Sequence, residues 1–149
     1  NINLSSTGDL YVTGSSFLYD TLSIILSTDH GMTFTPVQLN FYASYATNTY
    51  LTIDRRDSLY VVMGPQIYRR NGVNNWDTLH NGGWTTDVYI YFDNNNKIYL
   101  STNYQGVYYS ADDSTFTNLS TGIPTYPDLW GIPEKITLFD IGFDSNNIP

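Results

Sequence analysis

The sequence predicts an all-β protein built from repeated four-stranded antiparallel units. Aromatic residues make up 16% of the chain, with 14 Tyr, 7 Phe and 3 Trp, and such residues favour pleated, half-buried surfaces. Similar short segments recur at intervals of roughly 40–50 residues, which indicates an internal repeat. Short apolar runs alternate with polar turn residues, and no window has a convincing helical period.

Three markers define the repeat. A polar turn followed by an aliphatic residue, a tyrosine and a second aliphatic residue occurs at Gly8–Thr13, Arg56–Val62 and Asn95–Ser101. An aromatic residue after a polar turn occurs at Phe34, Trp76 and Phe116. A strand that ends in aspartate occurs at Tyr50–Asp54, Tyr89–Asp93 and Asp140–Asp144, and the last of these would begin a fourth repeat.

The strands follow from the apolar runs between the turns, taken in chain order. The first repeat predicts strands at Ile2–Leu4, Leu10–Thr13, Leu22–Ser27 and Phe34–Gln38. The second predicts strands at Tyr50–Asp54, Leu59–Met63, Ile67–Arg70 and Trp76–Leu79. The third predicts strands at Val88–Asp93, Ile98–Ser101, Val107–Ser110 and Phe116–Leu119.

A period near 40 residues with four strands per unit is typical of a β-propeller blade. We therefore expect three blades at about 1–40, 48–80 and 87–120, and the start of a fourth at about 135–149. A blade buries its faces only against its neighbours, and closed propellers use about 4–8 blades. The chain is expected to be part of a larger propeller, with the remaining blades supplied by the same chain or by another.

One specific motif accompanies the repeat. Residues 27–34 read S-x-D-x-G-x-T-F, and this motif resembles the Asp-box, or BNR repeat, of sialidase-like β-propellers. The residues that match it are Ser27, Asp29, Gly31, Thr33 and Phe34. The third repeat carries an eroded copy in Ser110, Asp112 and Phe116, with Ser114 where glycine is expected. Residues 70–76 keep little beyond a turn and the aromatic residue.

The residues of the motif have structural uses. Asp29 can accept hydrogen bonds from backbone N–H groups of its own turn, and Gly31 can take a positive φ. Phe34 is expected to point inward and to anchor the turn to the sheet. The resemblance implies that the Asp-box lies on the face away from the active site, so no catalytic role is assigned to these residues. His30 is expected to be an exposed spacer.

The face of such a propeller opposite to the Asp-box turns would carry the long loops, and these loops are rich in aromatic residues such as Phe41. Exposed aromatic rings among amides and hydroxyls suit sugar rings or peptides. Loops on rigid scaffolds commonly carry binding residues. The candidate ligand-binding residues are Tyr42, Tyr45, Trp84, Tyr104, Tyr126 and Trp130.

Charge and composition argue against other classes of partner. The net charge of −8 and the total of 6 Lys and Arg disfavour nucleic acid and anionic membrane surfaces. The longest apolar stretch, around Ile24–Leu26, is too short to span a bilayer. The chain has no cysteine, and no metal site or cofactor is expected. A secreted or cell-surface binding module for a glycan or a protein surface is the predicted function.

Two alternatives stay open. The chain could be a fragment of an Asp-box glycoside hydrolase of the sialidase or xyloglucanase type, and in the xyloglucanase type Asp87 or Asp128 could serve as a catalytic aspartate. Against that reading, the only glutamate is Glu134, and no arginine triad of the sialidase kind is recognised. The chain could also be a propeller that acts as a protein-assembly scaffold.

Overall fold

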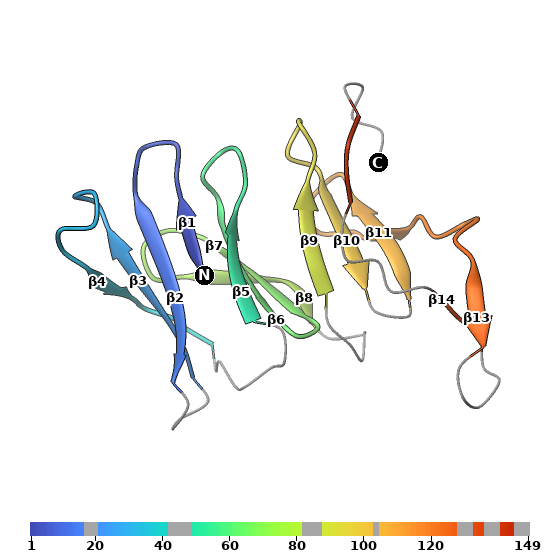
Figure 1. Ribbon diagram of the computed structural model, residues 1–149, viewed down its shortest axis with the longest axis horizontal. Coiled ribbons are helices and arrows are strands. Elements are labelled where there is room, and N and C mark those ends of the chain that lie inside the picture. The colour runs from blue at the N-terminus through green and yellow to red at the C-terminus, as the bar shows by residue number, and fades with distance from the viewer. Residues whose placement is uncertain are drawn as a thin grey trace. The chain divides into compact units, whose positions relative to one another are not determined.

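The computed structural model of the protein describes residues 1–16, 21–41, 49–81, 88–102, 105–127, 133–135 and 141–144. These residues form strands and turns and no helix, so the all-β prediction is confirmed. They form three four-stranded antiparallel sheets and one two-stranded sheet (Figure 1). The chain divides into two compact units, residues 1–81 and residues 82–149.

The first unit holds two sheets, each of which is a simple meander of consecutive strands. The first sheet consists of β1 (Ile2–Leu4), β2 (Leu10–Ser16), β3 (Thr21–Ser27) and β4 (Thr35–Val37). The second sheet consists of β5 (Thr49–Ile53), β6 (Leu59–Met63), β7 (Gln66–Arg70) and β8 (Trp76–Asn81). The pairing of β7 with β8 shifts register between Ile67 and Tyr68.

The second unit holds the third sheet and a short hairpin. The sheet consists of β9 (Val88–Phe92), β10 (Ile98–Thr102), β11 (Gly106–Ser110) and β12 (Thr117–Asn118). The hairpin consists of β13 (Thr125–Pro127) and β14 (Pro133–Lys135). Residues 141–144 have no strand, and most of the segment predicted to begin a fourth blade lies outside the described residues.

The twelve strands predicted for the three repeats are observed as β1 to β12, with different ends in most cases, whereas residues 141–144 do not form the strand that was predicted to end at Asp144. The predictions for β1 and β6 agree in both bounds, whereas β2 continues to Ser16 and β12 is shorter than expected. The β13–β14 hairpin was not predicted, because no strand was expected between the third repeat, which ends near residue 120, and the fourth, which begins near residue 135. Pro127 and Pro133 lie in these strands, and proline is unusual in strands away from sheet edges, so nothing in the local pattern predicted them.

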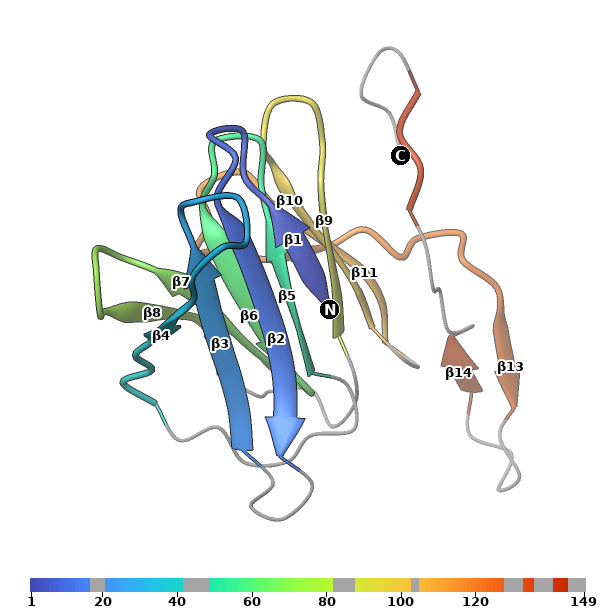
Figure 2. The same ribbon diagram turned by 60° about the vertical axis from the view of Figure 1, so that its left-hand side comes forward.

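The two sheets of the first unit stack face to face (Figure 2). Alternate side chains of a strand point to one face, so Tyr11, Ile24 and Val37 of the first sheet share the face that packs on the second. The side chains that the second sheet contributes to this core are Leu51, Leu59, Val61, Met63, Tyr68 and Trp76. The stacking therefore buries an apolar layer that neither sheet could bury alone.

Polar groups fix the position of the two sheets at the border of this core. The side-chain amides of Asn1 and Asn3 donate to the backbone carbonyl of Leu51, at 3.2 and 2.9 Å. At the opposite edge, the indole Nε1 of Trp76 donates to the carbonyl of Gln38 at 3.0 Å. Side chains of each sheet thus donate hydrogen bonds to a backbone carbonyl in or beside the other sheet.

Aromatic stacking closes the core at its outer edge. Phe41 lies flat on Tyr68, with ring centroids 3.8 Å apart, and meets the edge of Trp76 at 5.7 Å. Phe41 belongs to the aromatic loop set of the sequence, yet it packs into the core of the first unit.

We expect Leu51→Ala to lower the free energy of unfolding by about 2–5 kcal/mol, because Leu51 is 1% exposed between the two sheets. Val73→Ala is the matched control in the same unit. Val73 is 75% exposed, so its replacement should change stability by no more than about 0.5 kcal/mol. Chemical denaturation measures both variants, and equal effects would contradict the assignment of this core.

Candidate functional site

The turn after β3, which carries the S-x-D-x-G-x-T-F motif, is closed by its own side chains. The Oδ1 atom of Asp29 accepts from the hydroxyl of Ser27 at 2.7 Å and from the backbone N–H of Thr33 at 2.8 Å. The Oδ2 atom accepts from the hydroxyl of Thr33 at 2.6 Å. The hydroxyl oxygen of Ser27, 1% exposed, accepts from the N–H of Gly31 at 2.8 Å. These contacts make the residues structural.

Two consecutive residues of this turn have positive φ, His30 at 59° and Gly31 at 88°. Glycine takes such a φ without steric cost, which explains its place in the motif. His30 is exposed. The expectation that Phe34 points inward was wrong, because its side chain is 42% exposed. Val37 of β4 faces the core, and alternation along the strand turns position 34 to the other side.

The third sheet repeats the turn with one residue fewer. The Oδ1 atom of Asp112 accepts from the hydroxyl of Ser110 at 3.1 Å, and from the N–H groups of Ser114 and Thr115 at 3.0 and 2.7 Å. Only Asp113 takes a positive φ here, at 61°. Ser114 can replace the expected glycine because the shorter turn does not need a second positive φ.

The second sheet closes its turn by other means. The N–H of Asn71 donates to the carbonyl of Asn75 at 2.7 Å, and Gly72 takes a φ of 82°. The guanidinium of Arg70 donates to the carbonyl of Val73 through Nε at 3.3 Å and Nη2 at 2.7 Å. Arg70 stands at the first position of the motif, where the other two sheets have serine.

A second kind of hydrogen-bonded turn joins the first and second strands of each sheet. This turn was not predicted from the sequence. Its first residue accepts the N–H of the residue four positions on: Ser5 from Asp9 at 2.9 Å, Asp54 from Ser58 at 2.9 Å, and Asp93 from Lys97 at 2.8 Å. The fourth position takes a positive φ in Gly8, Asp57 and Asn96. The signal that could have found it is the aspartate that ends the first strand.

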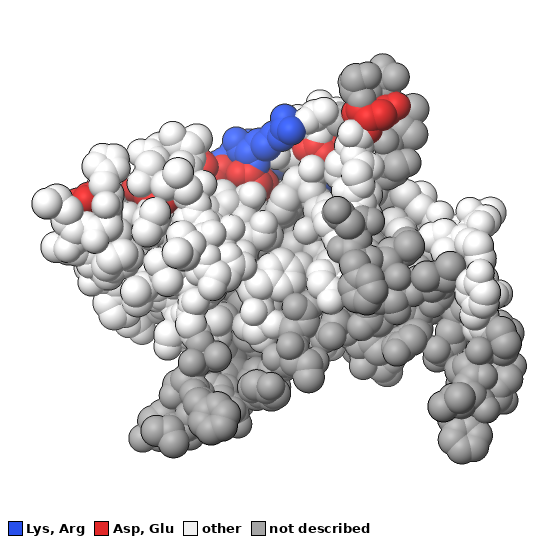
Figure 3. Space-filling view, viewed as in Figure 1, with Lys and Arg blue, Asp and Glu red and all other residues white. Residues whose placement is uncertain are grey.

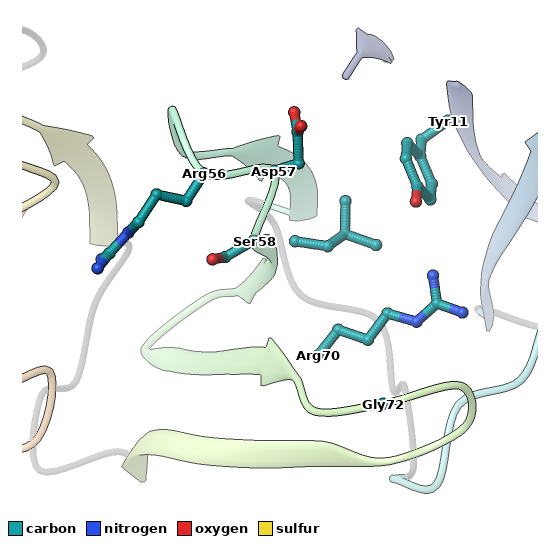
Figure 4. Close-up of a pocket in the computed structure, with 7 residues that line it drawn as sticks. Tyr11, Arg56, Asp57, Ser58, Arg70 and Gly72 are labelled. Carbon is teal, nitrogen blue, oxygen red and sulfur yellow. The ribbon is translucent and has the colours of Figure 1, made fainter. Parts of the chain in front are cut away.

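An open hollow of about 260 Å³ lies in the first unit, where the second sheet's turns meet the first sheet (Figure 4). Its lining residues are Tyr11, Arg56, Asp57, Ser58, Leu59, Arg70 and Gly72. The carboxylate of Asp57 already has hydrogen-bond partners, because its two oxygens accept from the backbone N–H and the hydroxyl of Ser6. These contacts lower the pKa of Asp57 and tie the two sheets together at the turns.

Two arginines, Arg56 and Arg70, line this hollow in an acidic chain. Four of the 6 basic residues are Arg55, Arg56, Arg69 and Arg70, all within the second sheet or its first turn. Arg56 contacts Asp54 at 3.7 Å, and Arg69 contacts Asp77 at 3.9 Å. Figure 3 shows Lys and Arg side chains gathered beside acidic ones on the face in view.

The predicted ligand-binding aromatics are only partly within the structure. Tyr126 lies in β13 and is 61% exposed, as a contact residue requires. The other five lie outside the described residues: Tyr42, Tyr45, Trp84, Tyr104 and Trp130. The same holds for Asp87 and Asp128, the candidate catalytic aspartates of the hydrolase alternative.

Comparison of the chain with protein-family models, with curated proteins and with solved structures finds no match. The described part of the chain holds no group of three His, Asp or Glu side chains placed to share a metal ion. Within the same ranges, no helix has the length and hydrophobicity needed to cross a membrane.

We expect the carboxyl group of Asp29 to titrate at a pKa of about 2, chiefly because the hydroxyl of Thr33 donates to its ionised form. The lowered pKa means that the turn is stabilised above the ordinary aspartate pKa of about 3.9, and that this contribution is lost as the pH falls toward 2. Carbon NMR titration measures the pKa. Thr33→Val should raise it, and a wild-type pKa near 4 would contradict the described contacts.

Proposed function

We propose that the chain is a segment of an Asp-box β-propeller, in which each four-stranded sheet is a blade. The stacking of the first two sheets supports this, since one blade covers the face of the next. The second unit supplies a parallel observation. Phe143, in the segment 141–144, lies against Tyr99 of β10 with ring centroids 4.9 Å apart. Tyr99 occupies the repeat position of Tyr11, which packs against the following sheet.

The uncovered face of the first sheet supports the same arrangement. Val61 on β6 is fully buried by the first sheet, whereas Val12, at the same repeat position on β2, is only half-buried. Ile2 pairs with Val12 and shares its face, and Ile2 and Leu4 are 67% and 65% exposed. An apolar face that is covered in one repeat and open in another is suited to a further blade.

In the full-length protein we expect Ile2→Ser and Leu4→Ser each to lower the free energy of unfolding by about 1.5–3 kcal/mol, because a further blade would bury both side chains. Val73→Ser is the control, since Val73 lies in a turn and is 75% exposed. Denaturation measures all three. Losses at Ile2 and Leu4 as small as that at Val73 would contradict the propeller arrangement.

We further propose that this propeller segment is a non-catalytic binding module, secreted or at the cell surface, that presents aromatic loops to a glycan or a protein surface. The observation that carries the proposal is the use of the carboxylates. Asp29, Asp54, Asp93 and Asp112 each accept N–H groups of their own turns, which is a structural task. The aromatic residues remain as the side chains suited to a ligand, and the exposed Tyr126 is the described example.

A glycan array with the full-length protein tests this function. We expect binding to a glycan class that is lost, by at least about tenfold in affinity, in Trp84→Ala and Trp130→Ala, because stacked rings contribute a large share of sugar binding. Val73→Ala serves as the folded control. Protein capture without any sugar binding would favour the scaffold alternative, and hydrolysis of xyloglucan or sialosides would overturn the non-catalytic assignment.

A further inference from the structure

The hollow beside Arg70 has the features of a small-anion site, and its first feature is the position of the guanidinium. Neighbouring residues of a strand point to opposite faces, so Arg70 shares the face of Tyr68, which packs on the first sheet. Figure 4 shows the Arg70 guanidinium directed toward the hydroxyl of Tyr11, whereas Arg56 points away. The cation therefore lies between the two sheets at the mouth of the core.

Arg70 is incompletely engaged for a guanidinium. It has five N–H donors, and the carbonyl of Val73 accepts from two of its nitrogens. Unlike Arg56 and Arg69, Arg70 forms no ion pair within the described part of the chain. Planar guanidinium groups bind carboxylates through two parallel hydrogen bonds, which a single carbonyl does not replace.

Tyr11 supplies a second donor. Tyr11 is 9% exposed, and its hydroxyl group faces the Arg70 guanidinium in the hollow (Figure 4). Burial, partly offset by Arg70, raises the pKa of Tyr11 above its ordinary value. The hydroxyl group consequently keeps its proton at neutral pH and can donate it to an acceptor in the hollow.

The repeat itself explains how the hollow came to be there. In the first and third sheets the first box position is a buried serine that bonds the turn, Ser27 and Ser110. In the second sheet the box has eroded, and the same position carries the long cation of Arg70. The turn is then closed through backbone and guanidinium contacts, and the space over Leu59 stays open.

We propose that this hollow binds the carboxylate group of a small organic acid, with the Arg70 guanidinium and the Tyr11 hydroxyl as donors and Leu59 as its apolar floor. Asp57 also lines the hollow and carries a negative charge, but its oxygens are occupied by Ser6. Binding therefore depends on directed hydrogen bonds more than on the net charge of the site. The site is independent of the aromatic loops of the proposed function.

The test is an NMR titration of the full-length, isotope-labelled protein with glucuronate and with N-acetylglutamate. The two probes share the carboxylate and distinguish an acidic sugar from an acidic amino acid as its source. We expect shifts centred on the amides of Leu59, Arg70 and Gly72 and on the Arg70 Nε–H. Glucose, which has no carboxylate, and N-acetylglutamine amide, in which both carboxylates of N-acetylglutamate are replaced by amides, should leave these signals in place.

Variants separate binding from folding. Arg70→Gln should weaken binding by at least about tenfold, because a charge-assisted pair of hydrogen bonds is lost. Tyr11→Phe keeps the buried ring and should weaken binding severalfold even where Arg70→Gln disturbs the turn. Arg69→Gln, one residue away on the opposite face, should bind as the wild type does.

Two results would overturn the proposal. One is unchanged affinity in a folded Tyr11→Phe variant together with shifts spread over the whole surface. The other is binding of inorganic phosphate as tightly as the carboxylates, since the hollow would then recognise charge alone. Loss of glycan binding through the aromatic loops would leave these outcomes untouched, so the two proposals fail separately.

Discussion

A four-stranded sheet of this repeat cannot bury its own apolar faces, and the rest of the structure depends on that constraint. The sheet has two faces and no covering helix in the part of the chain described, so each face needs another sheet. In the first unit this need is met by a layer that runs from Tyr11 to Trp76. The amide contacts to Leu51 then fix how the two sheets sit, because a buried carbonyl without a donor is costly.

Turns rather than strands carry the specific polar chemistry of the chain. The turns between first and second strands, and between third and fourth strands, leave the sheet at the same end because the meander is antiparallel. Both kinds place an acceptor side chain where several N–H groups converge. Four of the 14 acidic residues, Asp29, Asp54, Asp93 and Asp112, accept N–H groups of their own turns.

The periodic part of the fold was predictable from the sequence. Alternating apolar residues and turn-forming asparagine, aspartate and glycine identify strands because both signals are local. The Asp29 contacts were predictable for the same reason, since all partners lie within four residues. Phe34 was not, because its burial depends on which face a neighbouring sheet covers. The β13–β14 hairpin was not, because its strands are short and contain proline.

The hollow was invisible to sequence reasoning for a stronger reason. Tyr11 and Arg70 are far apart in the chain, and they meet only because two repeats stack. In the sequence, residues 70–76 of the second repeat match the S-x-D-x-G-x-T-F motif only in a turn and an aromatic residue. Seen in the structure, the same position exchanges a serine that bonds its own turn for an arginine that reaches the neighbouring sheet.

That exchange shows how a repeat fold can gain a binding site without a new element. A box serine acts within one turn, so its loss is tolerable where the backbone contact between Asn71 and Asn75 already closes the turn. Arg70, at the first position of this turn, then points into the space between the two sheets, where it faces Tyr11 of the first repeat. In a stack of similar sheets, a turn that lacks the motif serine is therefore a place where charged side chains of two sheets can meet. The apolar core between the sheets remains intact.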